Sequence, residues 1–335
     1  MKILLPTLDF MPQTGGVARY IKSIDDTLPE VTISYWKGFL AHPLKTFIRM
    51  MKESSGYDAL WIHHIFPLGT AAWFVHLFTR KPYVIFLHGM DFDQARRSDP
   101  RRFLARRILQ SAKKVVTNTH ALKREVDTFA DVKAMVVHPV VDDALIEASK
   151  VTFAEKKRHN DIVLLTVARL VSRKGHEEVL RILPSLKDIR YHIVGDGVHR
   201  KYLQELITEL GLEDRVEMKQ HVSDKMLADV YRQADIFVMP TKKTSHDREG
   251  FGIVYLEAQL VGVPVIAVNH PGVDEAFIDK VSGYAIADNP MQLKQAIKRL
   301  ANNPDRRKRM GRAGREFVLA GFTRVQEMKK LRSLL

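Results

Sequence analysis

The stretch Val263-Pro264-Val265-Ile266-Ala267-Val268 would be apolar on both faces if it formed a strand. A strand of that kind needs helices on both sides, as strands of parallel sheets have. Outward from this stretch, short apolar runs alternate with helix-length segments along the whole chain, which predicts βαβ units and parallel sheets. The predicted strands are residues 2–6, 31–35, 59–63, 83–87, 114–117, 134–137, 162–167, 190–194, 216–218, 236–239, 263–268 and 283–286.

The pattern divides the chain into two similar halves. A length of 335 residues suits two domains of roughly 150 residues each. Between the halves, the polar run of residues 142–161 has no strong period and is predicted to be a linker. The sequence therefore predicts an α/β protein with two doubly wound, parallel-sheet domains facing across a cleft. Ligands in such folds bind beyond the carboxyl ends of the strands.

Composition excludes several classes of protein. No apolar run approaches the ~18 residues needed to cross a bilayer. The opening residues 1–6 are too short for a signal peptide and are predicted to be a buried strand. The absence of cysteine excludes disulfides and thiolate metal sites. These features are compatible with a cytoplasmic protein.

The net charge of +14 is concentrated in two segments. Residues 96–114 contain eight Lys or Arg side chains against Asp99 alone, and residues 294–332 contain thirteen against three acidic side chains. Two basic faces on an otherwise balanced chain predict an anionic partner. Phospholipid headgroups, a polyphosphate-linked acceptor and nucleic acid all fit that description.

Two glutamates eight positions apart, Glu249 and Glu257, form the most informative polar motif. Glu249 is predicted to lie in a loop, and Glu257 about two turns into an apolar helix that begins near Gly252. The free N–H groups of a helix's first turn and the positive end of its dipole bind anions. The motif therefore predicts a phosphate at the helix mouth with carboxylates beside it for hydroxyl groups, as a sugar nucleotide would require.

Further motifs follow other predicted strands: Gly15-Gly16, His88-Gly89-Met90-Asp91, the Arg169 to Lys174 loop, Gly195-Asp196-Gly197, and Gly272-Val273-Asp274-Glu275. With the Glu249–Glu257 stretch, this set resembles glycosyltransferase family 4, the retaining group with the GT-B fold, over essentially the full length. The resemblance implies two Rossmann-like domains. Residues 1–145, completed by a C-terminal helix at 322–335, would be the acceptor-side domain, and residues 160–320 the nucleotide-sugar domain.

The resemblance also implies roles for individual residues. Arg169 and Lys174 would hold the diphosphate, and two cations on one loop can stabilise a leaving nucleotide without a metal. Glu249 and His88 would contact the transferred sugar, and Glu257 the ribose hydroxyls. The predicted catalytic residues are His88, Arg169, Lys174 and Glu249. The predicted substrate-binding residues are Gly15, Gly16, Asp91, Gly195, Val222, Gly250, Phe251, Gly252, Ile253 and Glu257.

Two motifs could suggest a metal site. Asp91-Phe92-Asp93 matches the Asp-x-Asp pattern that holds Mg²⁺ or Mn²⁺ against a diphosphate. A single-domain, metal-dependent transferase would not explain a second half with Arg169 and Lys174, however. His63 and His64 are neighbours on a predicted strand, so their side chains are expected on opposite sides of the sheet. We therefore expect no essential metal and no other cofactor.

The predicted function is retaining transfer of a hexosyl group from a nucleoside-diphosphate sugar to a hydroxyl acceptor, such as a lipid-linked or cell-surface glycan precursor. GDP-mannose, UDP-glucose and UDP-N-acetylglucosamine stay open as donors, because a loop near residues 219–224 would contact the base. A sugar-nucleotide epimerase of the same architecture is one alternative. A basic nucleic-acid-binding protein is the other, disfavoured because the basic segments lack interleaved aromatic residues and no recognised module is present.

Residues 99–112 predict an amphipathic helix in the first basic segment. One interpretation is a helix that packs on its own domain and exposes a solvated basic face. The other is a face that rests on anionic lipid at the inner side of a membrane, where each Lys or Arg contributes ~1 kcal/mol. The apolar positions are Phe103, Leu104, Ile108 and Leu109, and the arginines are Arg101, Arg102, Arg106 and Arg107.

Overall fold

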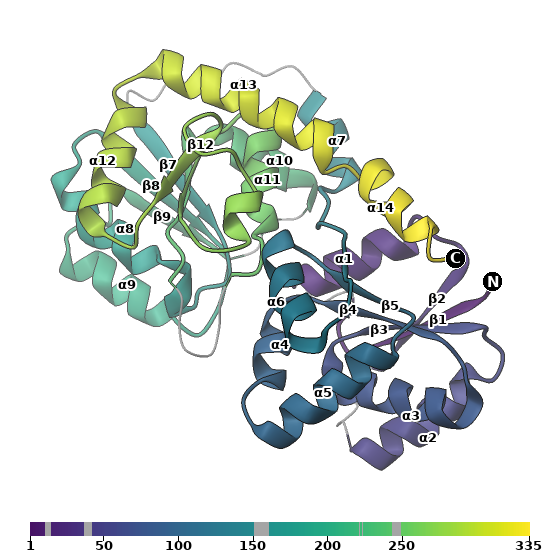
Figure 1. Cartoon of the computed structure of the whole chain (residues 1–335). Helices are drawn as coiled ribbons and strands as arrows, with labels where there is room; N and C mark the ends of the chain where they lie inside the picture. The colour runs from purple at the N-terminus through teal and green to yellow at the C-terminus, as the bar shows by residue number, and fades with distance from the viewer. Residues whose placement is uncertain (11–14, 37–41, 151–160, 221, 223, 243–248) are drawn as a thin grey trace. The chain divides into compact units, whose positions relative to one another are not determined.

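The chain forms two compact α/β units (Figure 1). The computed structural model describes residues 1–10, 15–36, 42–150, 161–220, 222, 224–242 and 249–335. The first unit comprises Met1–Val140 and Arg324–Leu335, and the second comprises Val141–Thr323. Each unit has one parallel six-stranded sheet.

The sheet of the first unit has the strand order β2-β1-β3-β4-β5-β6. Side chains of β1, β3 and β4 are buried along the full strand, because helices cover both faces of the sheet. The chain direction across the sheet reverses between β1 and β3, so their carboxyl ends form the switch point at which ligands bind in such sheets. The strands are β1 (Ile3–Thr7), β2 (Val31–Tyr35), β3 (Ala59–His63), β4 (Tyr83–Leu87), β5 (Lys114–Thr117) and β6 (Met135–Val136).

Helices cover both faces of this sheet. Helices α2, α3, α5 and α6 contribute Met50, Val75, Ile108 and Val126 to the core on one face. Helices α1 and α14 contribute Ile21, Met328 and others on the opposite face. The helices are α1 (Gly16–Asp25), α2 (Pro43–Ser54), α3 (Thr70–Thr79), α4 (Met90–Ala95), α5 (Asp99–Ser111), α6 (His120–Ala130) and the C-terminal α14 (Arg324–Arg332), with a short π-helical turn η1 (Ile65–Gly69).

The sheet of the second unit has the order β12-β11-β10-β7-β8-β9. Its first strand, β7, lies between β8 and β10, so the switch point is formed by the carboxyl ends of β7 and β10. Every pair in the sheet is parallel. The strands are β7 (Ile162–Val167), β8 (Ile189–Val194), β9 (Val216–Lys219), β10 (Ile236–Met239), β11 (Val265–Val268) and β12 (Gly283–Ile286).

The helices of the second unit also form two layers. One core includes residues of α8, α9 and α12, and the other includes residues of α7, α10, α11 and α13. The helices are α7 (Asp143–Lys150), α8 (His176–Ile182), α9 (Arg200–Glu209), α10 (Asp224–Gln233), α11 (Ile253–Leu260), α12 (Pro290–Ala301) and α13 (Pro304–Gly321), with short 3₁₀ turns η2 (Ser172–Lys174), η3 (Leu183–Ser185) and η4 (Val273–Glu275).

The two parallel sheets confirm the predicted fold class, and every predicted strand is present within a residue or two. The largest difference is in β11, which begins at Val265 rather than Val263. Proline has no N–H to donate, so Pro264 cannot pair fully in a central strand, although its carbonyl accepts the N–H of Phe237 at 3.0 Å.

The predicted linker is wrong in its first part. Residues 143–150 form α7, and Leu145 of this helix is 4% exposed in the core beside α10 and α11. The helix is only eight residues long, which is too short for a helical period to stand out in the sequence. Residues 151–160, the remainder of the predicted linker, lie outside the described residues.

The C-terminal helix α14 packs on the first unit. Met328 and Leu331 are fully buried there. Glu327 accepts the backbone N–H of His138 at 3.0 Å, and Arg324 pairs with Asp26 at 3.1 Å. Both polar and apolar contacts therefore tie the end of the chain to the first sheet.

Candidate functional site

A buried cluster of charged side chains lies at the switch point of the second sheet. Glu249, from the segment after β10, accepts a hydrogen bond from Arg173 at 2.9 Å and pairs with Lys174. The side chains of Arg173 and Lys174 are each 10% exposed, and that of Glu249 is 12% exposed. Two cations and one carboxylate are thus held together at the point where such sheets bind ligands. We call these three residues the Glu249 cluster.

The cluster keeps its charges despite burial. Burial alone would raise the pKa of Glu249, but the positive charges of Lys174 and Arg173 outweigh it and lower the pKa below its usual value. Burial lowers the pKa of Lys174, and the nearby charges of Arg173 and Arg169 lower it further, while Glu249 opposes them. Arg169 is therefore close enough to act on Lys174. With Arg169 included, the described residues of the site carry three cations against one carboxylate, which favours an anionic ligand.

Backbone geometry fixes the loop that carries Lys174. Gly175 has φ +76°, and a Cβ there would lie 2.1 Å from the carbonyl oxygen of Pro240. Only glycine allows the loop after β7 to approach the end of β10 so closely. The N–H of Lys242 donates to the carbonyl of Arg173 at 2.7 Å, which locks the two segments together.

Helix α11 begins where the sequence predicts, directly after Gly252. Gly252 has φ +82°, and a Cβ there would lie 2.5 Å from the ring of Tyr255, so the turn into the helix requires glycine. The side chain of Phe251 is 2% exposed and belongs to the core. Any ligand contact of Phe251 or Gly252 would therefore come from the backbone, and the predicted contacts of the Phe251, Gly252 and Ile253 N–H groups stay predictions.

Glu257 lies inside α11 and is only 2% exposed. The hydroxyl of Tyr231, on α10, donates to its carboxylate at 2.6 Å. This burial excludes the interpretation of Glu257 as an ordinary surface residue. A buried carboxylate requires hydrogen-bond partners. A contact with ribose stays a prediction.

Gly195 and Gly197 have a packing role. A Cβ on Gly195 would lie 2.0 Å from the carbonyl oxygen of Ala168, and one on Gly197 would lie 2.5 Å from that of Leu170. The N–H of Ala168 donates to the carbonyl of Val194, the last residue of β8, at 3.0 Å, and the N–H of Leu170 donates to the carbonyl of Asp196 at 2.9 Å. These two glycines therefore let the loops after β7 and β8 pack backbone to backbone. Substrate contact by Gly195 stays a prediction.

The remaining predicted residues lie as follows. Arg169 is exposed and forms no ion pair with a described residue. Val222 is half-buried against the core beside α10. Gly15 and Gly16 are exposed at the start of α1, where a Cβ on either would meet nothing within 4 Å. Gly250 is half-buried beside Glu249.

A second polar cluster lies at the switch point of the first sheet. His88, which follows β4, is linked to His63 at the end of β3, with 2.8 Å between Nε2 of His88 and Nδ1 of His63. His64 contacts Asp9, which follows β1, with 2.9 Å between Nε2 and Oδ2. Asp91 accepts the backbone N–H of His88 at 3.0 Å and lies 3.8 Å from Nδ1 of His64. We call these five residues the histidine cluster.

The three imidazoles of this cluster differ in charge. Burial would lower the pKa of His64, but Asp9 and Asp91 outweigh it and raise the pKa to about 9, so His64 is a cation at neutral pH. Burial lowers the pKa of His88 to about 4, and the positive charge of His64 acts in the same direction, against Asp91. Burial also holds the pKa of His63 well below its usual value. His63 and His88 are therefore neutral beside one imidazolium.

The expectation that His63 and His64 face opposite sides of the sheet is wrong. The strand ends at His63, and His64 has φ +75° and ψ 144°, which is not a strand conformation. The backbone turns there, and both rings reach His88, with ring centroids 5.1 and 5.8 Å away. Alternation of side chains holds only while the strand continues.

Sequence reasoning missed Arg173, Tyr231, His63, His64 and Asp9. Arg173 directly precedes Lys174 in the sequence, and these two adjacent positive charges are a signal for its part in the Glu249 cluster. In the sequence, the pair His63-His64 suggests only a metal site. Neither Tyr231 nor Asp9 carries a local signal, because each acts on a partner far away in the chain.

Solved structures share this fold. Anabaena HepE, in a complex with UDP, superposes with a TM-score of 0.84 at 18% identity over 100% of both chains. A sucrose-phosphate synthase from Thermosynechococcus elongatus gives a TM-score of 0.81 at 19% identity over 99% of this chain and 98% of that one. Two Rossmann-like units of this kind define the GT-B fold.

Comparison with protein families then gives the class of enzyme. Residues 14–145 match Glycosyltransferase Family 4, and residues 148–317 match glycosyl transferases group 1. This chain therefore belongs to the group 1 glycosyltransferases, and it is a glycosyltransferase. An uncharacterized glycosyltransferase of Methanocaldococcus jannaschii is 25% identical over 95% of this chain and 93% of its own length.

Among named relatives is a GDP-mannose-dependent alpha-(1-6)-phosphatidylinositol monomannoside mannosyltransferase of Mycobacterium tuberculosis. It is 26% identical over 95% of this chain and 94% of its own length. Within the described residues, no helix is both long enough and apolar enough to span a membrane.

Proposed function

We propose that this glycosyltransferase moves a hexosyl group from a nucleoside-diphosphate sugar to a hydroxyl of a lipid-linked or cell-surface glycan precursor. In this proposal the anomeric configuration is retained and no metal or other cofactor is needed. The observation that carries the proposal is the Glu249 cluster at the switch point of the second sheet, beside the start of α11. Cations, a carboxylate and helix N–H groups together suit a diphosphate joined to a sugar.

The cations support departure of the nucleoside diphosphate. Negative charge builds on the leaving phosphate in the transition state, and preorganised donors in a partly buried site stabilise that charge. Lys174 and Arg173 are held in place by Glu249, while exposed Arg169 is free of ion pairs with described residues. Arg169 can therefore join the two fixed cations when a diphosphate binds. Cationic side chains then supply the charge that a metal ion would otherwise supply.

The cations beside Glu249 keep its side chain ionised. Because its pKa is lowered, it is a carboxylate at neutral pH and can only accept hydrogen bonds. Hydroxyl groups of a transferred sugar would donate to it. Among the described residues at the strand ends of the second unit, no second carboxylate joins Glu249 in the Glu249 cluster. We therefore propose front-face attack rather than a covalent sugar intermediate. The departing phosphate would accept the proton of the acceptor hydroxyl.

A thermal-shift panel tests the donor. Relatives named as GDP-mannose-dependent support GDP-mannose, whereas structural neighbours were solved with UDP or UDP-glucose. We expect one of GDP-mannose, UDP-glucose or UDP-N-acetylglucosamine to stabilise the protein by ~2.7 kcal/mol at 100 times its Kd. NAD serves as the control and should give no shift. Absence of a shift with every nucleotide sugar would contradict the proposal.

The epimerase alternative is separated by product analysis. An epimerase would convert the nucleotide sugar into its epimer without any acceptor. We expect the donor to be recovered unchanged, apart from slow hydrolysis, until a glycan or glycolipid acceptor is added. Formation of the epimer without an acceptor would show that the enzyme is an epimerase and would contradict the proposed transfer.

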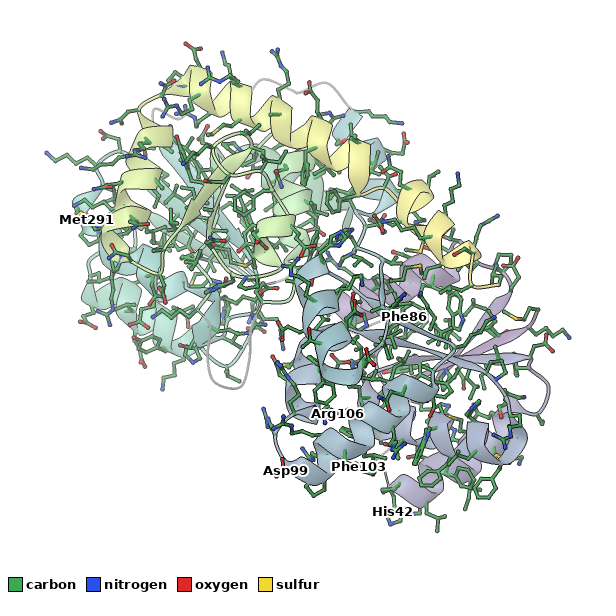
Figure 2. All side chains as sticks on the ribbon, in the orientation of Figure 1. His42, Phe86, Asp99, Phe103, Arg106 and Met291 are labelled. Carbon is green, nitrogen blue, oxygen red and sulfur yellow. The ribbon has the colours of Figure 1, made fainter. Side chains whose placement is uncertain are left out.

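We further propose that the first unit rests on anionic lipid at the inner face of a membrane. On α5, Ile108 and Leu109 pack into the core, so the predicted apolar face is mostly internal. Phe103, however, is 63% exposed, with the Arg107 guanidinium 5.2 Å from its ring centroid. Figure 2 labels Phe103 with Arg106 and Asp99 on this helix. Arg106 is partly engaged, because it donates to the carbonyl of Phe129 at 2.9 Å.

Neighbouring helices extend this surface with apolar side chains. Helices α2 and α3 lie side by side, joined by rings of Phe47 and Phe78 at 5.8 Å, and α3 is linked to α5 by Trp73 and Ser111 (Figure 1). We call the exposed apolar residues of the three helices the apolar ridge, which comprises Leu44, Ile48, Phe74, Leu77, Phe78 and Phe103.

Charge supports lipid as the occupant of the ridge. Exposed apolar patches on soluble surfaces mark sites of interaction. The same helices carry Lys45, Lys52 and the α5 arginines, while their acidic residues are Glu53, which pairs with Arg49, and Asp99. Apolar side chains flanked by cations fit an anionic bilayer, where the rings enter the interface and the cations meet headgroups. We propose no nucleic-acid partner for this surface.

A further inference from the structure

The predicted sugar-contacting residue, His88, is one of a pair of imidazoles at the ends of β3 and β4. The rings of His63 and His88 lie within 10° of parallel with centroids 5.1 Å apart, and Nδ1 of His63 lies 2.8 Å from Nε2 of His88. Two imidazoles joined by an in-plane hydrogen bond have this geometry, because the N–H of one ring points at the lone pair of the other. The pair is therefore hydrogen-bonded edge to edge rather than stacked.

The ring of His63 is buried among the rings of Phe86, Tyr20 and His88. Its side chain is 0% exposed. The ring stacks on Phe86 with centroids 4.7 Å apart and 5° between the planes, and the ring of Tyr20 lies edge-on with its centroid 5.9 Å away. It cannot rotate away from His88 without opening the core around β3 and β4.

The direction of the hydrogen bond follows from the other nitrogen of His63. Nε2 of His63 is buried and has no hydrogen-bond partner among the described residues. A proton on Nε2 would be a buried, unpaired N–H, which costs about 1–3 kcal/mol. A proton on Nδ1 instead donates to His88. Orphaned buried N–H groups are rarer than orphaned acceptors, so the second tautomer is favoured.

We propose that His63 is a positioning residue that fixes the tautomer of His88. Because His63 donates to Nε2 of His88, a neutral His88 must carry its own proton on Nδ1. His88 then presents an N–H donor, never an acceptor, to a ligand oxygen. This inference rests on the proposed function for the identity of that ligand, an oxygen of the transferred sugar.

Burial keeps His88 in this neutral state, because it lowers the pKa of the imidazole to about 4. His64, held between Asp9 and Asp91, places a positive charge beside the ring of His88, and a second positive charge there is unfavourable. Asp91 also accepts the backbone N–H of His88, which fixes the start of α4. Burial, with the charge of His64 acting in the same direction, thus keeps His88 neutral against Asp91 and Asp9, and His63 controls the position of its proton.

Histidine ring NMR tests the tautomer without any substrate. Protein labelled with ¹⁵N-histidine reports whether Nδ1 or Nε2 carries the proton, and His88→Gln identifies the His88 signals by their loss. We expect Nδ1–H in the wild type. Two variants of similar shape separate donation from packing: His63→Asn keeps a donor near the position of Nδ1, and His63→Asp offers only acceptors. The Nδ1–H form should persist in His63→Asn and give way to Nε2–H in His63→Asp.

Binding measurements give the functional consequence. For the nucleotide sugar selected by thermal shift, we expect His63→Asn to bind within about threefold of the wild type and His63→Asp about tenfold more weakly. The matching free nucleoside diphosphate should bind all three proteins equally, because His88 would contact only the sugar. His63→Leu provides a second donor-free variant if His63→Asp does not fold, as judged by thermal unfolding.

Nε2–H on His88 in the wild type would overturn the inference, as would a donor-free variant that binds the nucleotide sugar as tightly as the wild type. Failure of the wild type to bind any nucleotide sugar would instead overturn the proposed function. The NMR result would still decide the role of His63 in that case, so the two failures are distinguishable.

Discussion

Lys174 is the residue on which the proposed chemistry depends most. Its amino group is buried beside Glu249 and Arg173, at the predicted diphosphate site. Loss of one donor to a developing oxyanion typically lowers turnover by about 10²–10³-fold. We expect Lys174→Met to show a loss of this size in a sugar-transfer assay, while the circular dichroism spectrum is unchanged.

Lys201→Met is the matched control for this substitution, because Lys201 lies on α9 and its side chain is 88% exposed. It should transfer sugar at the wild-type rate. For the wild type and for Lys201→Met, the rate of sugar transfer should be the same with and without EDTA, since no metal is proposed. Wild-type turnover by Lys174→Met would show that the diphosphate binds elsewhere.

His64 makes the stability of the first unit depend on pH. Its pKa is raised from 6.5 to about 9 in the folded state by Asp9 and Asp91, against the effect of burial. A raised pKa contributes stability that is fully present below pH 6.5 and is lost as the pH rises through 9. A shift of this size corresponds to on the order of 3 kcal/mol. We expect the urea midpoint of the first unit to fall over that range.

The other two imidazoles act in the opposite pH direction. The lowered pKa values of His63 and His88 mean that stability is lost as the pH falls from 6.5 toward 4. Maximum stability is therefore expected near pH 6.5. In His64→Gln, which keeps a donor for Asp9 but does not titrate, the fall above pH 6.5 should disappear. An unchanged alkaline fall in that variant would assign it to another group.

At the scale of elements, the loops after β7 and β8 depend on glycine. Gly195 has φ +143°, and a Cβ there would lie 2.0 Å from the carbonyl oxygen of Ala168. The backbone would have to shift, so we expect Gly195→Ala to lower the free energy of unfolding by about 2–4 kcal/mol. The measurement is the thermal transition of the second unit by calorimetry.

Gly211→Ala isolates the effect of this close approach. Gly211 also has positive φ, at +62°, but a Cβ there would meet nothing within 4 Å. We expect it to cost about 1 kcal/mol, from backbone strain alone. Equal destabilisation by the two substitutions would mean that the contact with Ala168 relaxes easily.

At the scale of the whole molecule, the prediction concerns the membrane. In liposome sedimentation we expect binding to anionic vesicles that weakens with salt, because exposed charges are screened within a Debye length. Replacing Arg101, Arg102, Arg106 and Arg107 by Gln should reduce binding. Replacing Leu44 and Phe78 by Ser should reduce it as well, and this loss should not depend on salt.

The second basic segment provides a control with equal loss of charge. Lys298, Arg299, Lys308 and Arg309 are exposed on α12 and α13 of the second unit. Replacing these four by Gln should leave vesicle binding unchanged. If both fourfold variants lost binding equally, net charge would be responsible rather than the α5 surface. Equal binding of the wild type to neutral vesicles would exclude the anionic-lipid proposal.

Sequence by itself determined the fold. Buried parallel strands are short, apolar and separated by helix-length segments, so β7 or β11 can be recognised without knowledge of any contact. The glycines before α11 likewise predict the start of that helix, because Gly252 has a positive φ that other residues avoid. These signals involve residues that are close together in the chain, so they can be recognised in the sequence alone.

Only the tertiary structure decided which side chains act together. Arg173 shares Glu249 with Lys174 across about 75 positions, and Tyr231 reaches Glu257 from another helix. His63 and His64 join His88 because the backbone turns at His64, contrary to the alternation that a continuing strand would impose. The physical reason is that pKa, tautomer and ion pairing depend on distances of a few ångströms. Those distances are set by packing between segments and not by spacing along the chain.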